Sequence, residues 1–161
     1  MLMKTIKIIS LLTCFVLLFT LAACDSKENE DKVTIDNVLQ NAVSVHINGA
    51  EVNTVEASYG AFEGKQGDYI EFRFAGPQKI DTVFITEKTA TVRQFNIYAT
   101  IDDKETLIYT GKHILAENIK FEPVNATALK VEIVNTEIGN DNFVIQNISA
   151  YDLTEVQFNV D

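Results

Sequence analysis

The chain has 161 residues, of which 13 are Lys or Arg and 23 are Asp or Glu, so its formal net charge at pH 7 is −10. A chain this acidic is not drawn by its charge to nucleic acid or to anionic lipid, and we exclude nucleic acid as a partner. Only two cysteines are present, and tryptophan is absent.

The first predicted element is an export signal over residues 1–23. Lys4 and Lys7 precede an apolar stretch that ends in small residues directly before Cys24. A basic start, a short apolar core and a small-residue exit are typical of a secretory signal peptide. The apolar core is shorter than the roughly 20 residues of a membrane-spanning helix. An ordinary signal with a chance cysteine, or an uncleaved anchor, is the alternative.

The last four residues of this segment, Leu21-Ala22-Ala23-Cys24, resemble the lipobox of bacterial lipoproteins. The resemblance implies cleavage before Cys24, a diacylglycerol on its sulfur and a further acyl chain, and several chains anchor a protein stably. We therefore expect an exported protein of the bacterial cell envelope, at the cell surface or outer membrane, whose membrane contact is the lipid anchor. Loss of the two signal lysines takes the net charge from −10 to −12. Because Cys14 leaves with the signal, no thiol remains for disulfide, metal or redox chemistry.

Residues 24–32 are expected to form a polar tether, because 25–32 contains no apolar residue. This acidic stretch also resembles the surface-export signals of Bacteroidetes lipoproteins, and a solvated spacer is the alternative. The remaining residues, 33–161, suit one domain.

The domain reads as strands. Residues 34–42 are predicted as a helix with Thr34 as its N-cap. From residue 43 onward, apolar and polar positions alternate, which is typical of half-buried antiparallel strands. The alternation puts Val43, Val45 and Ile47 on one face and His46 on the opposite one. The residues expected to face the core include Ile70, Phe72, Phe74, Ile80, Val83, Ile85, Phe95, Ile97 and Ala99. Turns are expected at Gly76-Pro77, Asp102-Asp103, Gly111, Pro123 and Gly139-Asn140. About eight short strands at this spacing predict an all-β sandwich.

From residue 79 the order of features resembles the discoidin superfamily, the coagulation factor five/eight type C domains. The pieces that carry the likeness are Ile80–Glu87, Val92–Tyr98, Asp102–Lys104, Ile119–Ala126 and Ile148–Tyr151, with Ile47–Gly49 and Asn53-Thr54 upstream. The nearest likeness is to family 32 carbohydrate-binding modules and to the C-terminal domain of α-L-fucosidases, over about residues 40–153. It implies an antiparallel, galactose-binding-domain-like jelly-roll sandwich of eight strands with ligand loops at one end. Many members also hold a structural calcium near that end.

This chain departs from the family at the calcium position. Asn48 stands where an aspartate supplies the ion, and Asn147 stands where a glutamate opens the closing strand. Calcium prefers carboxylate oxygens, so a calcium site formed by Asn48, Thr54 and Asn147 is weakened by the loss of the two acidic side chains. Both a bound structural calcium and its absence are compatible with the sequence. The tryptophan that usually follows the opening threonine is Val55 here. An aromatic platform for a sugar must therefore be Tyr or Phe.

The first candidate ligand loop is the glycine-rich stretch 56–67. It holds the rings of Tyr59 and Phe62 and the charged side chain of Lys65. Glycines around the rings favour a loop, where rings have little reason to lie unless something binds. Glu87, at the end of a strand, is a further candidate; solvation, or holding a neighbouring turn, is its alternative role.

The second candidate loop is 137–143. Asn140, Asp141 and Asn142 offer planar groups for bidentate hydrogen bonds to vicinal hydroxyls, and Phe143 is the first choice of platform. The alternative readings are that Asn and Asp are simply turn residues and that Phe143 is the first core residue of the closing strand.

Two functions compete on these observations. The first is a lipid-anchored, non-catalytic module that holds a glycan through loops at one end of the sandwich. The second is an adhesion or scaffold module that binds a partner protein of an envelope complex, with the sugar site lost. An enzyme is not predicted, because His46 and His113 are paired with no nucleophile in the sequence and no phosphate loop or serine elbow stands out.

Overall fold

The computed structural model describes residues 35–53, 60–114, 118–154 and 156, which belong to one compact unit of the chain, Thr34–Asp161. Apart from one 3₁₀ turn, the regular structure of these residues is β-strand, as the alternation predicts. In chain order the elements are η1 (Val38–Asn41), β1 (Ala42–Ile47), β2 (Ala50–Val52), β3 (Phe62–Lys65), β4 (Tyr69–Glu87), β5 (Val92–Ile101), β6 (Lys104–Gly111), β7 (Asn118–Thr136) and β8 (Asn142–Tyr151). Within these ranges the structure holds no helix of the length and apolarity that a bilayer crossing requires.

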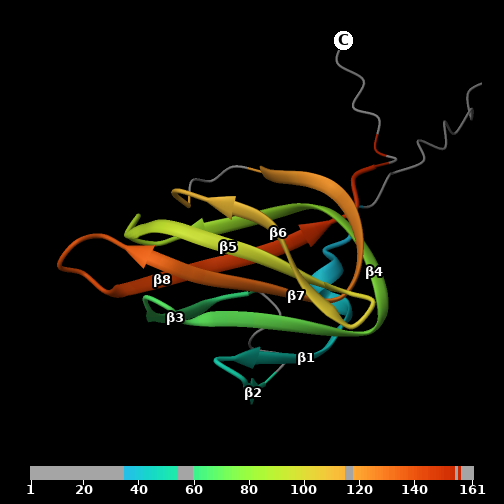
Figure 1. Ribbon diagram of the computed structural model, residues 1–161, viewed down its shortest axis with the longest axis horizontal. Helices are drawn as coiled ribbons and strands as arrows, with labels where there is room; N and C mark the ends of the chain where they lie inside the picture. The colour runs from blue at the N-terminus through green and yellow to red at the C-terminus, as the bar shows by residue number, and fades with distance from the viewer. Residues whose placement is uncertain (1–34, 54–59, 115–117, 155, 157–161) are drawn as a thin grey trace, which may run out of the picture. The chain divides into compact units, whose positions relative to one another are not determined.

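The eight strands form one continuous antiparallel sheet that folds over on itself. Its main path runs β2-β1-β4-β7-β5-β6, and β8 pairs with β4 and β3. The first half of β4 pairs with β1 and β7, whereas its second half pairs with β8 and with the first residues of β7. Figure 1 shows the curve of β4 that makes this change of partners possible. The result is the predicted all-β jelly roll. Its larger part consists of β2, β1, the first half of β4, the second half of β7, β5 and β6, and its smaller part of β3, β8, the second half of β4 and the first half of β7.

Two of the predicted turns lie inside long strands instead. Gly76 and Pro77 fall within β4, and Pro123 falls within β7, each at a place where the register between these two strands shifts. Proline lacks the N–H that a strand ladder needs, so a strand accommodates it at a bulge. The predicted turn at Asp102 and Asp103 is confirmed; both residues have positive φ, and they join β5 to β6.

The predicted helix over residues 34–42 is wrong in extent and in its cap. Only η1 is present in the described part, and its cap is Asn37, whose Oδ1 accepts a hydrogen bond from the Leu39 amide at 3.2 Å. The same oxygen accepts from the Ala150 amide of β8 at 3.0 Å, so Asn37 also ties this segment to the closing strand. Thr34, the expected cap, lies outside the described residues.

The inward faces of the strands meet in one core. The predicted inward positions are confirmed: Ile70, Phe72, Phe74, Ile80, Val83, Ile85, Phe95, Ile97 and Ala99 are all buried. A Cβ on Gly111 would lie 2.2 Å from Phe95 Cε1, so the Phe95 ring occupies space that only glycine leaves free.

Alternation in β1 fails at one position. Val45 is buried as predicted, but Val43, predicted on the same face, is 60% exposed because the register with β4 shifts beside it. His46 is half-buried on the outer side, with Nε2 3.1 Å from Ser44 Oγ. The described residues contain no cluster of three His, Cys, Asp or Glu side chains that could hold a metal ion.

Candidate ligand site at the loop end

Three loops that are far apart in the sequence lie side by side at one end of the domain. They join β3 to β4, β4 to β5 and β7 to β8. The Gln66 amide donates to the Asp141 carbonyl at 3.0 Å, and the Glu137 amide donates to the Thr91 carbonyl at 2.8 Å. These backbone bonds fasten the first and third loops together and the second to the third. The two candidate ligand loops of the sequence, 56–67 and 137–143, are therefore in contact through Gln66 and Asp141.

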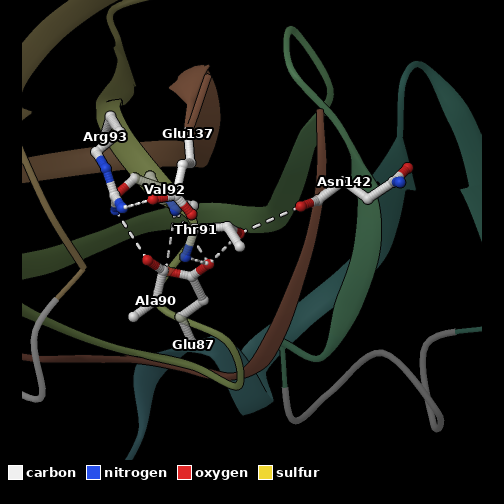
Figure 2. A network of polar contacts seen from close by, with 7 residues as sticks. All are labelled: Glu87, Ala90, Thr91, Val92, Arg93, Glu137 and Asn142. Atoms are coloured by element: carbon white, nitrogen blue, oxygen red, sulfur yellow. Dashed lines mark hydrogen bonds and ion pairs between the residues drawn. The ribbon is translucent and has the colours of Figure 1, made fainter. Parts of the chain in front are cut away.

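The Glu87 carboxylate holds the second of these loops (Figure 2). Its Oε1 lies 2.6 Å from the Thr91 amide nitrogen and 3.1 Å from the Val92 amide nitrogen, and it accepts from the Thr91 hydroxyl at 2.6 Å. The Thr91 hydroxyl also lies 3.2 Å from the carbonyl oxygen of Asn142, the first residue of β8 after the third loop. A carboxylate that accepts several N–H and O–H groups makes strong, charge-assisted bonds. The structure thus places Glu87 in the alternative role that the sequence left open, holding a neighbouring turn.

A cross-link on the far side of the same turn completes the frame (Figure 2). Arg93 Nη1 donates to the Ala90 carbonyl at 2.8 Å, and Arg93 Nη2 forms an ion pair with Glu137 at 3.0 Å. Ala90 has a positive φ of 51°, a conformation that costs a non-glycine residue energy unless its surroundings hold it. Glu87 and Arg93 supply those surroundings, so the loop frame is fixed before any ligand arrives.

A shallow hollow of about 350 Å³ lies over the paired ends of β3 and β8, beside the first loop. It is lined by Glu63, Gly64, Lys65, Asp68, Asn142, Phe143 and Val144. A second hollow of about 270 Å³ is lined by Lys65, Gln66 and Asp141. Lys65 lines both hollows. Three predicted site residues, Lys65, Asp141 and Asn142, are thus brought to one place, since Lys65 and Asn142 are direct partners in the β3–β8 ladder.

Gly64 and Asp68 shape this hollow. The Asp68 carboxylate accepts from the Lys65 amide at 2.7 Å and closes the turn between β3 and β4. A Cβ on Gly64 would lie 2.6 Å from Asp68 Oδ2 and 3.0 Å from Phe143 Cζ, so glycine lets both groups approach the strand. Sequence reasoning did not single out Asp68; the signal for it is its place after Gln66-Gly67, where a short acidic side chain is typical of a turn.

The aromatic platform expected at Phe143 is not available as an open surface. The Phe143 ring is 1% exposed and that of Phe62 is 5% exposed, and the two pack edge to face with ring centres 5.1 Å apart. A ring this buried has no free face on which a sugar can stack. Its neighbours match the alternative reading of Phe143, the first core residue of the closing strand.

The polar residues of the third loop are exposed. Asn140 follows Gly139, whose φ is 85°, and its Oδ1 accepts from the Asn142 amide at 3.3 Å. Asp141 lines the second hollow together with Lys65 and Gln66. Asn140, Asp141 and Asn142 therefore combine a turn role with accessible hydrogen-bonding groups. Tyr59 and Cys24 lie outside the described residues.

The two asparagines predicted at the calcium position lie on different strand pairs. Asn48 lies in the β1–β2 turn of the larger part, and its Oδ1 accepts from the Tyr69 amide at 2.9 Å. Asn147 lies on β8 opposite Thr86, in the smaller part. Thr54 lies outside the described residues. The Asn48 oxygen is already engaged, so a calcium ion would have to compete with a backbone hydrogen bond.

Solved structures with the same architecture include carbohydrate-binding modules. The family 32 module of C. perfringens NanJ in complex with galactose matches with a TM-score of 0.58 over 74% of this chain and 100% of that one, at 15% identity. The domain has the jelly-roll fold of this module. The chitosan-binding module 1 of a Paenibacillus sp. IK-5 chitosanase/glucanase matches this jelly roll with a TM-score of 0.56 over 73% of this chain and 99% of that one, at 17% identity.

The jelly roll also matches part of larger enzymes. A putative α-L-fucosidase from Bacteroides ovatus ATCC 8483 aligns with a TM-score of 0.54 and 20% identity over 64% of this chain. The chain spans only 18% of that protein and 21% of a second putative α-L-fucosidase, from Bacteroides thetaiotaomicron. No protein-family model matches the sequence, and no curated protein matches it either. The similarity to these solved structures therefore establishes that the domain has a jelly-roll fold.

Proposed function

We propose that the protein is a lipid-anchored, non-catalytic carbohydrate-binding module of a bacterial cell envelope, which holds a glycan through the loop end of its jelly roll. The observation that carries this proposal is the pair of hollows at the ends of β3 and β8 on a fold that family 32 modules share. Lys65 lines both hollows, Asn142 lines the first and Asp141 lines the second. Lysine and amide groups suit hydroxyl-rich ligands, because they supply donors and acceptors in fixed directions.

The charges around the hollow favour a glycan without carboxylates. Glu63, Asp68 and Asp141 line the two hollows, and Lys65 is the single cation among their lining residues. An anionic uronate polymer would meet net repulsion here, whereas a neutral sugar would not. With Phe143 buried, contact relies on hydrogen bonds, so each site is expected to be weak. Many copies anchored on one surface would add avidity.

A glycan array tests this proposal with the protein produced from its full-length sequence. We expect binding to neutral glycans, with galactose-containing chains tested first, and weak or no binding to polyuronates. Lys65→Ala and Asn142→Ala should each weaken binding by about three- to tenfold, the loss of one or two hydrogen bonds. Lys112→Ala, an exposed lysine on the β6 side, removes the same charge away from the hollow and serves as the control. Unaltered binding in both loop variants would contradict the proposal.

The lipid anchor has its own test. Cys24→Ser should move the protein from the membrane fraction to the soluble exported fraction and abolish labelling with a fatty-acid probe. Membrane retention without labelling would instead support an uncleaved signal anchor. To test for calcium, the melting temperature of the protein is measured in millimolar Ca²⁺ and in a chelator. A bound calcium ion stabilises the folded state, so the melting temperature should rise with the Ca²⁺ concentration. Equal melting temperatures would remove calcium from the proposal.

One observation favours the second candidate, a module that binds a partner protein. Ile138, at the tip of the third loop, is fully exposed. A pull-down from envelope extract with Ile138→Ser as the matched variant separates the two functions. Loss of a co-purified protein in this variant, together with an empty glycan array, would favour the adhesion or scaffold role.

A further inference from the structure

The outer face of the larger part of the sheet carries two tyrosines around one lysine. Tyr69 on β4 and Tyr98 on β5 flank β7, and Lys130 Nζ of β7 lies 5.3 Å from the centre of the Tyr69 ring and 4.3 Å from that of Tyr98. All three side chains are half-buried, and none of them lines the loop-end hollows. These distances fit cation–π contacts, which hold the two rings in place on the sheet.

A chain of hydrogen bonds fixes the Tyr98 hydroxyl across three strands. Thr110 donates to Asn96 Oδ1 at 2.9 Å, Asn96 Nδ2 donates to the Tyr98 hydroxyl at 3.0 Å, and this hydroxyl donates to Glu132 Oε2 at 2.9 Å. Burial, and then the bond to Glu132, raise the pKa of Tyr98, which keeps the phenol protonated as a donor. The ring and the carboxylate are thus oriented in advance.

The charges on this face leave one carboxylate uncompensated. Lys130 Nζ pairs with Glu105 at 2.6 Å, and Arg73 pairs with Glu71 at 2.7 Å. Glu132 takes part in none of the ion pairs within the described ranges. Lys130 and Arg73 therefore already have carboxylate partners, while the Glu132 carboxylate, next to the Tyr98 ring, has no cation within ion-pair distance among the described residues. A ring and a carboxylate together are what a protonated amine binds best.

We propose that this face, centred on Tyr98 and Glu132, is a second binding surface, and that its ligand is a sugar chain with free, protonated amino groups. An amino group would meet the Glu132 carboxylate, and the C–H face of a sugar ring would lie against the part of the Tyr98 ring that Lys130 does not cover. A protein partner fits less well, because the centres of protein interfaces are depleted of charged residues and this centre is rich in them. A polyanion would find no free cation here.

The test is a titration of the full-length protein with a fully deacetylated glucosamine oligomer, in which binding is monitored by NMR chemical shifts. The matched ligand is the same oligomer in its N-acetylated form. We expect the deacetylated oligomer to bind more tightly, to lose affinity as salt is added, and to shift the signals of Tyr98 and Glu132. Glu132→Gln keeps an acceptor for the Tyr98 hydroxyl and removes the charge; it should weaken binding about two- to fivefold.

Two further variants complete the test. Tyr98→Ala should weaken binding about tenfold through loss of the stacking ring. Glu122→Gln makes the same charge change at an exposed position of β7 outside this face and should leave binding as it is. Equal affinity for the acetylated oligomer, an unaltered affinity in Glu132→Gln, or shifts confined to the loop end around Lys65 would each overturn the proposal. Tighter binding of an oligolysine peptide than of the amino sugar would overturn the ligand class.

Discussion

Glu87 Oε1 lies 2.6 Å from the backbone nitrogen of Thr91, so a single side chain at the end of β4 closes the turn that leads into β5. We expect Glu87→Gln to lower the free energy of unfolding by about 1–3 kcal/mol, because the amide replaces charge-assisted bonds by neutral ones. Urea denaturation measures this change. Glu122→Gln, an exposed glutamate on β7, is the control for the change in net charge. Equal effects of the two variants would show that Glu87 does not hold the turn.

Phe143 separates core packing from ligand contact. Phe143→Ala should lower the free energy of unfolding by about 3–5 kcal/mol, since the ring is 1% exposed and packs on Phe62. Phe143→Leu keeps most of the apolar volume and should fold, with glycan binding retained because the buried ring offers the ligand no open face to stack on. Thermal melting and the glycan array are measured on both variants. A folded Phe143→Leu protein that no longer binds would restore Phe143 as a platform.

Gly111 is predicted to tolerate a methyl group poorly, because the Phe95 ring fills the space beside it. Gly111→Ala would set a Cβ 2.2 Å from Phe95 Cε1, and we expect a loss of about 1–3 kcal/mol through overpacking of the core. Gly76→Ala is the matched control, because a Cβ there meets nothing within 4 Å. Chemical denaturation of the two proteins should differ clearly. Comparable stabilities would mean that the Phe95 ring moves aside without cost.

Tyr98 should ionise at a higher pH than an ordinary tyrosine. Its pKa is raised first by burial and next by the hydrogen bond to Glu132, so the protonated phenol is favoured in the folded state. This contribution to stability is complete below the pKa of the unfolded chain, about 10, and is lost as pH rises above it. Ultraviolet titration of the phenolate, with Tyr98→Phe to assign the signal, measures the shift. Glu132→Gln should lower this pKa, and an unaltered titration would contradict the role of Glu132.

Which strand residues face inward and which face outward was predictable from the sequence, because alternation is a local property of a strand. Ile70, Phe72 and Phe74 had to share a face, and burial of that face follows from the hydrophobic effect. Alternation does not show where a strand bends. Pro77 was therefore predicted as a turn, whereas the structure accommodates it at a register shift inside β4.

The candidate site was predictable only as separate loops. Lys65 and Asn142 were both singled out, but their pairing depends on the β3–β8 ladder, which joins residues far apart in the chain. Sequence alone likewise left Phe143 as either platform or core residue, since one apolar position at the start of a strand is compatible with both.

By itself, the sequence determined the strand-rich domain, its buried face and its acidic surface, because each follows from the order of neighbouring residues or from composition. The tertiary structure alone decided that Glu87 holds a turn, that Phe143 is buried and that Glu132 carries an unpaired charge beside Tyr98. These roles depend on contacts between distant strands, and such contacts exist only once the sheet has folded over on itself.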